Sequence, residues 1–282
     1  MKIKISADST CDLSQELIEA YGIDILPLYI IKNGESFIDG KNITADDIYA
    51  HVAAGGEITT TAAGGVADYA DYFSKTLESY DAIIHFHISG EMSACYQNAC
   101  IAAAELSNVF PVDSRNLSTG IGLLVLDAAE LAREGKLTAE EIVAAVQAKR
   151  EKLDVSFLVD TLAYLRKGGR CSAVAALGAN LLSLKPCIEV KDGKMGVGKK
   201  YRGKMDKCLQ QYVKERLEGR TDIDLKRIFI TESGGYSEAQ IEEIKAEILQ
   251  YQPFAEVLHT RAGCTISSHC GPGTLGILYA HK

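Results

Sequence analysis

The sequence predicts an α/β protein of two domains: an N-terminal domain with a doubly wound, mostly parallel sheet at residues 1–154, and a smaller C-terminal α+β domain at residues 155–282. Three observations support this prediction. Strand-like apolar runs alternate with helical patterns up to about residue 152. Beyond residue 154 this alternation gives way to a short helix, a small apolar segment and a hairpin. A chain of 282 residues is also long enough for two domains and a cleft between them.

The first half contains the elements of the expected parallel sheet. Gly22 ends the first helix, and Asn33-Gly34 predicts a hairpin turn. Thr138 begins a capping box for the last helix of this half. We expect strands at 2–7, 23–31, 36–38, 82–88 and 108–113, and helices at 15–21, after 44, after 65, after 93, at 119–134 and from 139 to about 152.

The second half contains fewer parallel-sheet signals. Asp192-Gly193 predicts the turn of a hairpin over residues 188–197. We expect strands also at 155–159, 227–231 and 256–259 and after 276, and helices from 160 to about 167, at 204–218 and at 237–250.

The stretch at 82–99 organises the first domain. An apolar strand runs into Ser89-Gly90, and a helical pattern follows Ser93. A helix that starts directly after a strand directs unpaired N–H groups and the positive end of its dipole at one spot, which suits a phosphate or a carboxylate. The alternative is that Ser93 only caps its own helix.

Two other polar segments come from distant parts of the chain. Thr59-Thr60-Thr61 forms a hydroxyl-rich loop before a helix, although it could be a simple turn or cap. His269 stands beside a glycine-rich turn near the C-terminus. Thr60, Thr61, Ser93 and His269 are therefore the candidate binding residues.

The charge distribution is uneven. The chain carries −8 overall, which argues against nucleic-acid binding. Residues 166–207 contain eleven Lys and Arg against three acidic residues, so this segment is net +8 and the remainder is −16. Such a basic segment on an acidic protein suggests docking to an acidic partner, while the alternative is a hairpin with lysine-rich solvent faces.

The sequence shows no feature of export or membrane insertion. No apolar run approaches eighteen residues, and residues 1–8 lack the core of a signal peptide. The eight cysteines form no C-x-x-C pair. We therefore expect a cytoplasmic protein with reduced thiols and no integral membrane segment.

Three kinds of catalytic or metal site were considered. Ser93 and His269 suggest a hydrolase, but residues 90–94 do not match the G-x-S-x-G nucleophile elbow. His85 and His87 lie on one strand face and could ligate a metal with His269 and Cys270, a weak pattern. No nucleotide phosphate-binding motif is present. We expect no bound metal and no cofactor.

Five segments together resemble motifs of the DegV family, in order and over essentially the whole chain. They are residues 7–13 (ADSTCDL), 88–99 (ISGEMSACYQNA), 160–170 (DTLAYLRKGGR), 182–186 (LSLKP) followed by Asp192-Gly193, and 269–273 (HCGPG). The resemblance implies a bacterial cytosolic protein that binds a long-chain fatty acid, such as palmitate, stearate or oleate, in a tunnel between two α/β domains.

The resemblance also implies roles for particular residues. Ser93 and His269 match positions that contact the fatty acid carboxylate, and Thr61 matches the first residue of the family's T-S-Q-P element, with Thr60 as a possible shift. This chain has Ala62-Ala63-Gly64 after Thr61, and Ala94-Cys95 after Ser93. Arg166, Lys167 and Arg170 match a basic loop that resembles a partner-docking surface.

The implied function is not enzymatic. Family members that serve a fatty acid kinase hold the acid while a separate kinase subunit phosphorylates its carboxyl group. The alternative for this chain is a small-molecule hydrolase that uses Ser93 and His269. Binding of a buried acyl chain requires a movable lid, and residues 173–182 are the expected part of it.

Overall fold

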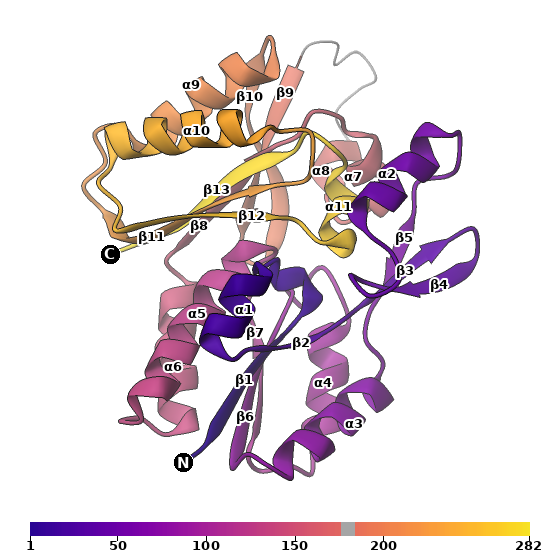
Figure 1. Ribbon diagram of the computed structural model, residues 1–282, viewed down its shortest axis with the longest axis vertical. Coiled ribbons are helices and arrows are strands. Elements are labelled where there is room, and N and C mark those ends of the chain that lie inside the picture. The colour runs from indigo at the N-terminus through magenta and orange to yellow at the C-terminus, as the bar shows by residue number, and fades with distance from the viewer. Residues whose placement is uncertain (176–183) are drawn as a thin grey trace.

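The computed structural model describes residues 1–175 and 184–282, and its first sheet is the expected parallel one (Figure 1). Four strands pair in the order β2-β1-β6-β7. The two central strands are almost entirely buried, as expected for a sheet covered by helices on both faces. The strands are β1 (Ile3–Asp8), β2 (Asp24–Leu26), β6 (Ala82–His87) and β7 (Val109–Asp113).

Helices cover both faces of this sheet (Figure 1). The Ser14 hydroxyl accepts the Leu17 N–H and Thr138 forms the predicted capping box, so both helices start where the sequence indicates. One face carries α1 (Gln15–Tyr21), α5 (Thr119–Glu134) and α6 (Ala139–Arg150), and the other carries α3 (Val66–Leu77) and α4 (Cys95–Ala103), with a 3-10 turn η1 (Ser9–Cys11) after β1.

The second sheet is mixed and has six strands, in the order β10-β9-β8-β13-β11-β12. The predicted turn at Asp192-Gly193 joins β9 to β10. Helices α9 (Met205–Leu217) and α10 (Glu238–Tyr251) pack together over it. The strands are β8 (Leu153–Leu158), β9 (Leu184–Lys191), β10 (Lys194–Arg202), β11 (Ile223–Glu232), β12 (Glu256–Arg261) and β13 (Leu275–His281).

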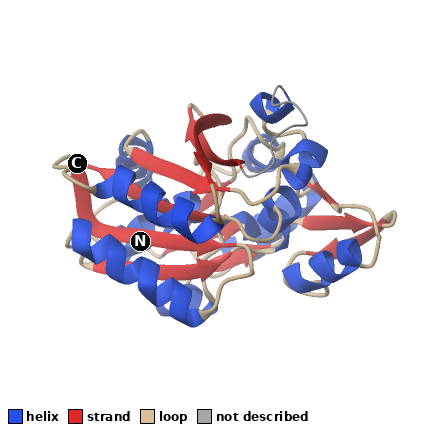
Figure 2. Cartoon of the chain, turned by 90° about the horizontal axis from the view of Figure 1, so that it is seen from above, coloured by secondary structure: helices blue, strands red, loops and turns tan. Residues whose placement is uncertain are grey.

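A small third sheet corrects two predictions. The expected strand at 23–31 is divided into β2 and β3 (Tyr29–Lys32) at Pro27, which has no N–H for a ladder. The expected loop at 59–61 is instead largely strand β5 (Thr60–Ala62), because its backbone pairs with β3, Thr61 opposite Ile30. The sheet order is β4-β3-β5, with β4 at Glu35–Ile38, and it stands at one side of the molecule (Figure 2).

Helices from the C-terminal half complete the site region. Helix α11 (Cys264–Cys270) contacts α2 (Ala45–Ala53), β5 and β3, so it joins the C-terminal half to the small sheet. Helix α7 (Ala163–Gly168) begins three residues later than predicted, and α8 (Ser172–Ala175) follows it. Residues 176–182 of the expected lid lie outside the described residues.

One apolar core extends across both large sheets. It includes Phe86 of β6, Leu124 of α5 and Phe229 of β11, all fully buried. Helix α5 contacts strands of both sheets, which explains why its first half is buried on all sides. Among the described residues, no helix is long and apolar enough to cross a membrane.

Candidate ligand-binding site

A cavity of about 220 Å³ opens where β5, the loop after β6, α11 and the second sheet meet. Its walls are mainly aliphatic, with one aromatic ring from Phe157, and such a lining is typical of a site for an apolar ligand. Polar side chains are also present, among them Thr61, Ser93, Arg170, Glu232 and His269. The apolar lining includes Leu28, Ala63, Ile88, Met92, Leu117, Phe157, Leu165, Met195, Ile266 and Leu278.

Thr61 and His269 form a direct pair on the cavity wall. Thr61 Oγ1 lies 2.8 Å from His269 Nε2, although the two residues are 208 positions apart in sequence. Burial, and secondarily the charge of Arg170, lower the pKa of His269 to about 4. The imidazole is therefore neutral near pH 7, and its Nδ1 is buried with no hydrogen-bond partner.

The position of His269 depends on Gly168 at the end of α7. A Cβ at residue 168 would lie 2.2 Å from His269 Nδ1. The carbonyl of Gly168 also accepts a hydrogen bond from Arg170 Nη1 at 2.7 Å. The glycine therefore leaves room for the imidazole while its backbone orients the guanidinium.

Ser93 lies in the loop between β6 and α4. It is one residue earlier than the N-cap position expected for it, because α4 starts at Cys95 and Ala94 is its N-cap. Its Oγ accepts the Cys95 N–H at 3.3 Å and lies 3.0 Å from Cys95 Sγ. This half-buried hydroxyl lines the cavity. Because it accepts only one backbone hydrogen bond, of 3.3 Å, it can also donate its proton to a ligand.

The remaining predicted residues occupy different places. Thr60 is exposed on β5 and does not line the cavity, in contrast to Thr61. Arg166 and Lys167 are exposed on α7, and Lys167 forms an ion pair with Glu57 at 3.2 Å. Arg170 is exposed too, but it also lines the cavity, so its charge acts on the pocket as well as on the surface.

The geometry does not assemble a hydrolase dyad. The hydroxyl bonded to His269 Nε2 is that of Thr61, whereas Ser93 Oγ contacts the N–H and Sγ of Cys95. A nucleophile needs its base within hydrogen-bond reach. Within the described residues no hydrogen bond joins Ser93 to His269.

Sequence reasoning missed the two carboxylates that hold α11. Asp39 Oδ1 accepts the Cys264 N–H, and its Oδ2 accepts the N–H and hydroxyl of Thr265. Asp12 accepts the Gly263 N–H at 2.9 Å, and burial raises its pKa to about 8. Acidic residues close in sequence to a helix N-terminus help to predict that helix. Here the two aspartates are more than 200 residues away from α11 in sequence, so this signal is absent.

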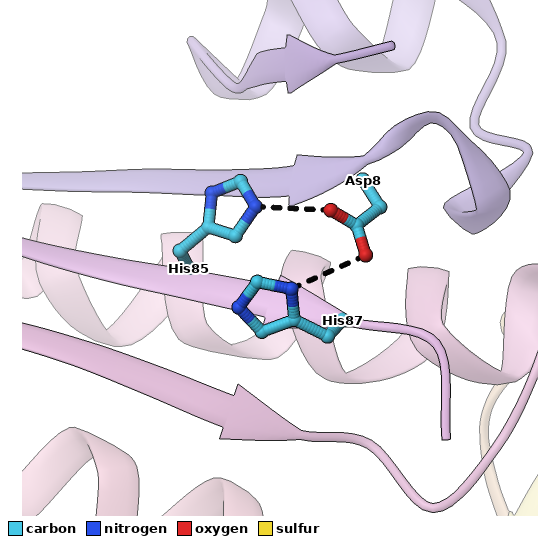
Figure 3. Close-up of side chains that lie close together, drawn as sticks. All are labelled: Asp8, His85 and His87. Carbon is cyan, nitrogen blue, oxygen red and sulfur yellow. Dashed lines mark hydrogen bonds and ion pairs between the residues drawn. The ribbon is translucent and has the colours of Figure 1, made fainter. Parts of the chain in front are cut away.

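The two histidines of β6 meet an aspartate that the sequence argument did not assign to them. His85 Nε2 lies 3.3 Å from Asp8 Oδ1, and His87 Nδ1 lies 3.2 Å from Asp8 Oδ2 (Figure 3). His269 and Cys270, the other ligands considered, belong to α11 instead. The alternating pattern of β1 could have indicated this group, since Ser6 and Asp8 share one strand face.

Comparison with known proteins identifies the family of this chain. A family model described as an uncharacterised protein of the DegV family matches residues 2–282. The chain belongs to the DegV family. A DegV domain-containing protein of Clostridium perfringens is 33% identical over 100% of this chain and 99% of its own length.

Solved DegV structures share the fold. The first is described as showing fatty acid binding of a DegV family protein from Thermus thermophilus. It superposes with a TM-score of 0.88 at 33% identity, over 99% of this chain and 100% of that one. DegV of Bacillus subtilis, described as a fatty acid binding protein, gives a TM-score of 0.82 at 26% identity and covers 100% of both chains. The two-domain α/β architecture of the DegV proteins is therefore the architecture of this chain.

Proposed function

We propose that this chain binds a long-chain fatty acid without chemically altering it. The carboxylate would bind at Thr61, Ser93 and His269, and the acyl chain would fill the apolar cavity. The observation that carries the proposal is the Thr61–His269 pair on the wall of an otherwise largely apolar cavity that Ser93 also lines. The fatty acid binding described for the Thermus and Bacillus relatives supports it.

The tautomer of His269 determines how the carboxylate is held. A neutral imidazole with its proton on Nε2 donates to Thr61 Oγ1, which leaves the Thr61 hydroxyl proton free for the ligand. Ser93 supplies a second hydroxyl proton, and Arg170 attracts the anion from the edge of the cavity. Hydrogen bonds to a charged acceptor are worth about 1.5–3 kcal/mol each.

The acyl chain supplies most of the affinity. Burial of a methylene stabilises by about 0.8 kcal/mol, so fourteen methylenes give roughly 11 kcal/mol before the cost of ordering ligand and protein is subtracted. Palmitate, stearate and oleate belong to this class of ligand. The shape of the apolar wall, rather than the head-group contacts, would select chain length and kinks.

The second part of the proposal concerns a partner. The exposed basic residues of α7, Arg166 and Lys167, together with Arg170 at the cavity, would dock a separate kinase subunit that phosphorylates the bound carboxyl group. Arg170 lines the cavity, and Arg166 and Lys167 are exposed on α7 a few residues before it, which supports this role. A group of positive charges on one surface mainly raises the rate at which an acidic partner associates and fixes its orientation.

The head-group assignment is tested with Ser93→Ala. Loss of one charge-assisted hydrogen bond should weaken palmitate binding by at least about ten-fold, measured by competition with a fluorescent fatty acid. Ser74→Ala, on the exposed side of α3, is the matched control and should bind like the parent chain. Equal affinities of the Ser93→Ala variant and the parent, with both folded, would refute the assigned contact.

A further inference from the structure

Two neighbouring parallel strands bring three potential metal ligands together inside the first domain. The register of β1 on β6 places Ser6 opposite His85 and Ala7 opposite Phe86, so Asp8 and His87 follow at the ends of the two strands. Asp8, His85 and His87 each have 0% exposed surface. One ligand atom from each lies within 4.8 Å of the others (Figure 3).

We propose that Asp8, His85 and His87 form a binding site for a divalent first-row transition-metal cation, with Zn²⁺ as the preferred ion. Two imidazoles and one carboxylate are a donor set that such ions favour. Bonds of about 2.0–2.1 Å to a tetrahedral Zn²⁺ place neighbouring ligand atoms about 3.3 Å apart. His85 Nε2 lies 3.3 Å from one Asp8 oxygen and His87 Nδ1 lies 3.2 Å from the other, so a carboxylate that binds the ion through both oxygens would have each nitrogen at that spacing.

Two of the three residues, His85 and Asp8, have additional hydrogen bonds that would orient them as metal ligands. His85 Nδ1 lies 2.7 Å from Ser6 Oγ, which would fix the ring with its Nε2 directed at the site. The Tyr69 hydroxyl donates to Asp8 Oδ1 at 2.8 Å. Metal-bound histidines and carboxylates typically have such outer hydrogen bonds, which hold the ligand atoms in place before the ion binds.

Charge balance also favours a cation. Asp8 is a fully buried carboxylate, and among the interactions of the described residues its ionic partners are the two imidazoles, not a lysine or arginine. A buried carboxylate requires a compensating positive charge or a metal.

The bound ion would have a structural role distinct from ligand binding. It would join the ends of β1 and β6 beneath Tyr69 of α3, at the strand that leads into the Ser93 loop. Because the three side chains have no access to solvent, we expect loading during folding rather than rapid exchange.

The test uses the full-length chain without an affinity tag, refolded from denaturant in the presence of Co²⁺ or Zn²⁺ and freed of loose ions by gel filtration. We expect about one ion per chain by elemental analysis, intense visible absorption from low-coordinate Co²⁺, and a higher melting temperature than after refolding with a chelator. Refolded parent chain that retains no ion under these conditions would overturn the proposal without any variant.

Matched variants locate the ion. His87→Gln and His85→Gln should each lose at least nine-tenths of the bound Co²⁺ and its absorption. His281→Gln is the control, because His281 also lies between two carboxylates, Asp154 and Asp222, at 3.3 and 3.5 Å but is partly exposed. Retention of the ion in His85→Gln and His87→Gln, or its loss in His281→Gln alone, would contradict the assignment.

Discussion

The Thr61 hydroxyl can donate its proton to a ligand only if His269 donates to it through Nε2. Enclosure by α7 and α11 keeps the imidazole uncharged, and the nearby Arg170 guanidinium acts in the same direction. The space for the ring exists because residue 168 has no side chain. In the proposed site, Gly168, Thr61 and His269 would together determine how one wall of the cavity binds a carboxylate.

The lowered pKa of His269 predicts a pH dependence of stability. Its value of about 4 in the folded chain is below the 6.5 of an ordinary histidine, so the unfolded chain takes up the proton first. The contribution of this residue is therefore complete above about pH 6.5, and is lost as pH falls from there towards 4. In urea titrations of the ligand-free chain, His269→Asn should show a smaller loss of unfolding free energy over this interval than the parent chain. Identical slopes in the two proteins would contradict the assignment.

At the scale of elements, α11 connects the two halves of the molecule. It carries His269, and its first N–H groups bond to Asp39 and Asp12 from the N-terminal half. The helix has seven residues, so hydrogen bonds from its first N–H groups to Asp39 and Asp12 are a large share of the contacts that fix its N-terminus. The proposed head-group site therefore depends on a contact between the N-terminal and C-terminal halves of the chain.

Asp39→Ala should destabilise the chain by about 2–4 kcal/mol, since it leaves buried N–H groups of α11 unpaired. Fatty acid affinity should fall as well, because the helix positions His269. Asp46→Ala is the control: its carboxylate is exposed and pairs with Arg261, so we expect a change below about 1 kcal/mol. Urea unfolding monitored by circular dichroism measures both. A loss for Asp39→Ala no larger than that of the control would argue against the anchoring role.

The proposed docking role of the basic residues of α7 can be tested with charge-reversal variants. Reversing the charges of Arg166 and Lys167 to glutamate should slow acyl-phosphate formation by an added fatty acid kinase subunit about ten-fold, and leave palmitate affinity unchanged. Lys75→Glu with Lys136→Glu, at the far domain, is the matched control. Parallel losses of coupling and palmitate affinity would show that these residues act on the cavity instead of on docking.

At the scale of the whole molecule, local signals determined most elements and long-range contacts determined the site. The cap at Thr138 and the turn at Asp192-Gly193 are encoded by neighbouring residues, and they appear as predicted. Strand β5 was missed because a three-residue strand has too little pattern of its own and is defined by its pairing with β3.

The composition of the polar clusters was harder to predict, for a related reason. His85 and His87 were correctly placed on one strand face, but their joining to Asp8 depends on the register of two strands 77 residues apart in sequence. The contact of Thr61 with His269 likewise requires the chain to return through α11. Spacing along the chain contains no information on either distance.

The most direct test is to purify the chain under native conditions from a bacterial host, denature it, and analyse the organic extract by mass spectrometry. We predict close to one long-chain fatty acid per chain, displaced by added palmitate and depleted in Ser93→Ala. Protein that is folded yet yields no fatty acid, and that takes up none from solution, would contradict the proposal that this cavity holds an acyl chain.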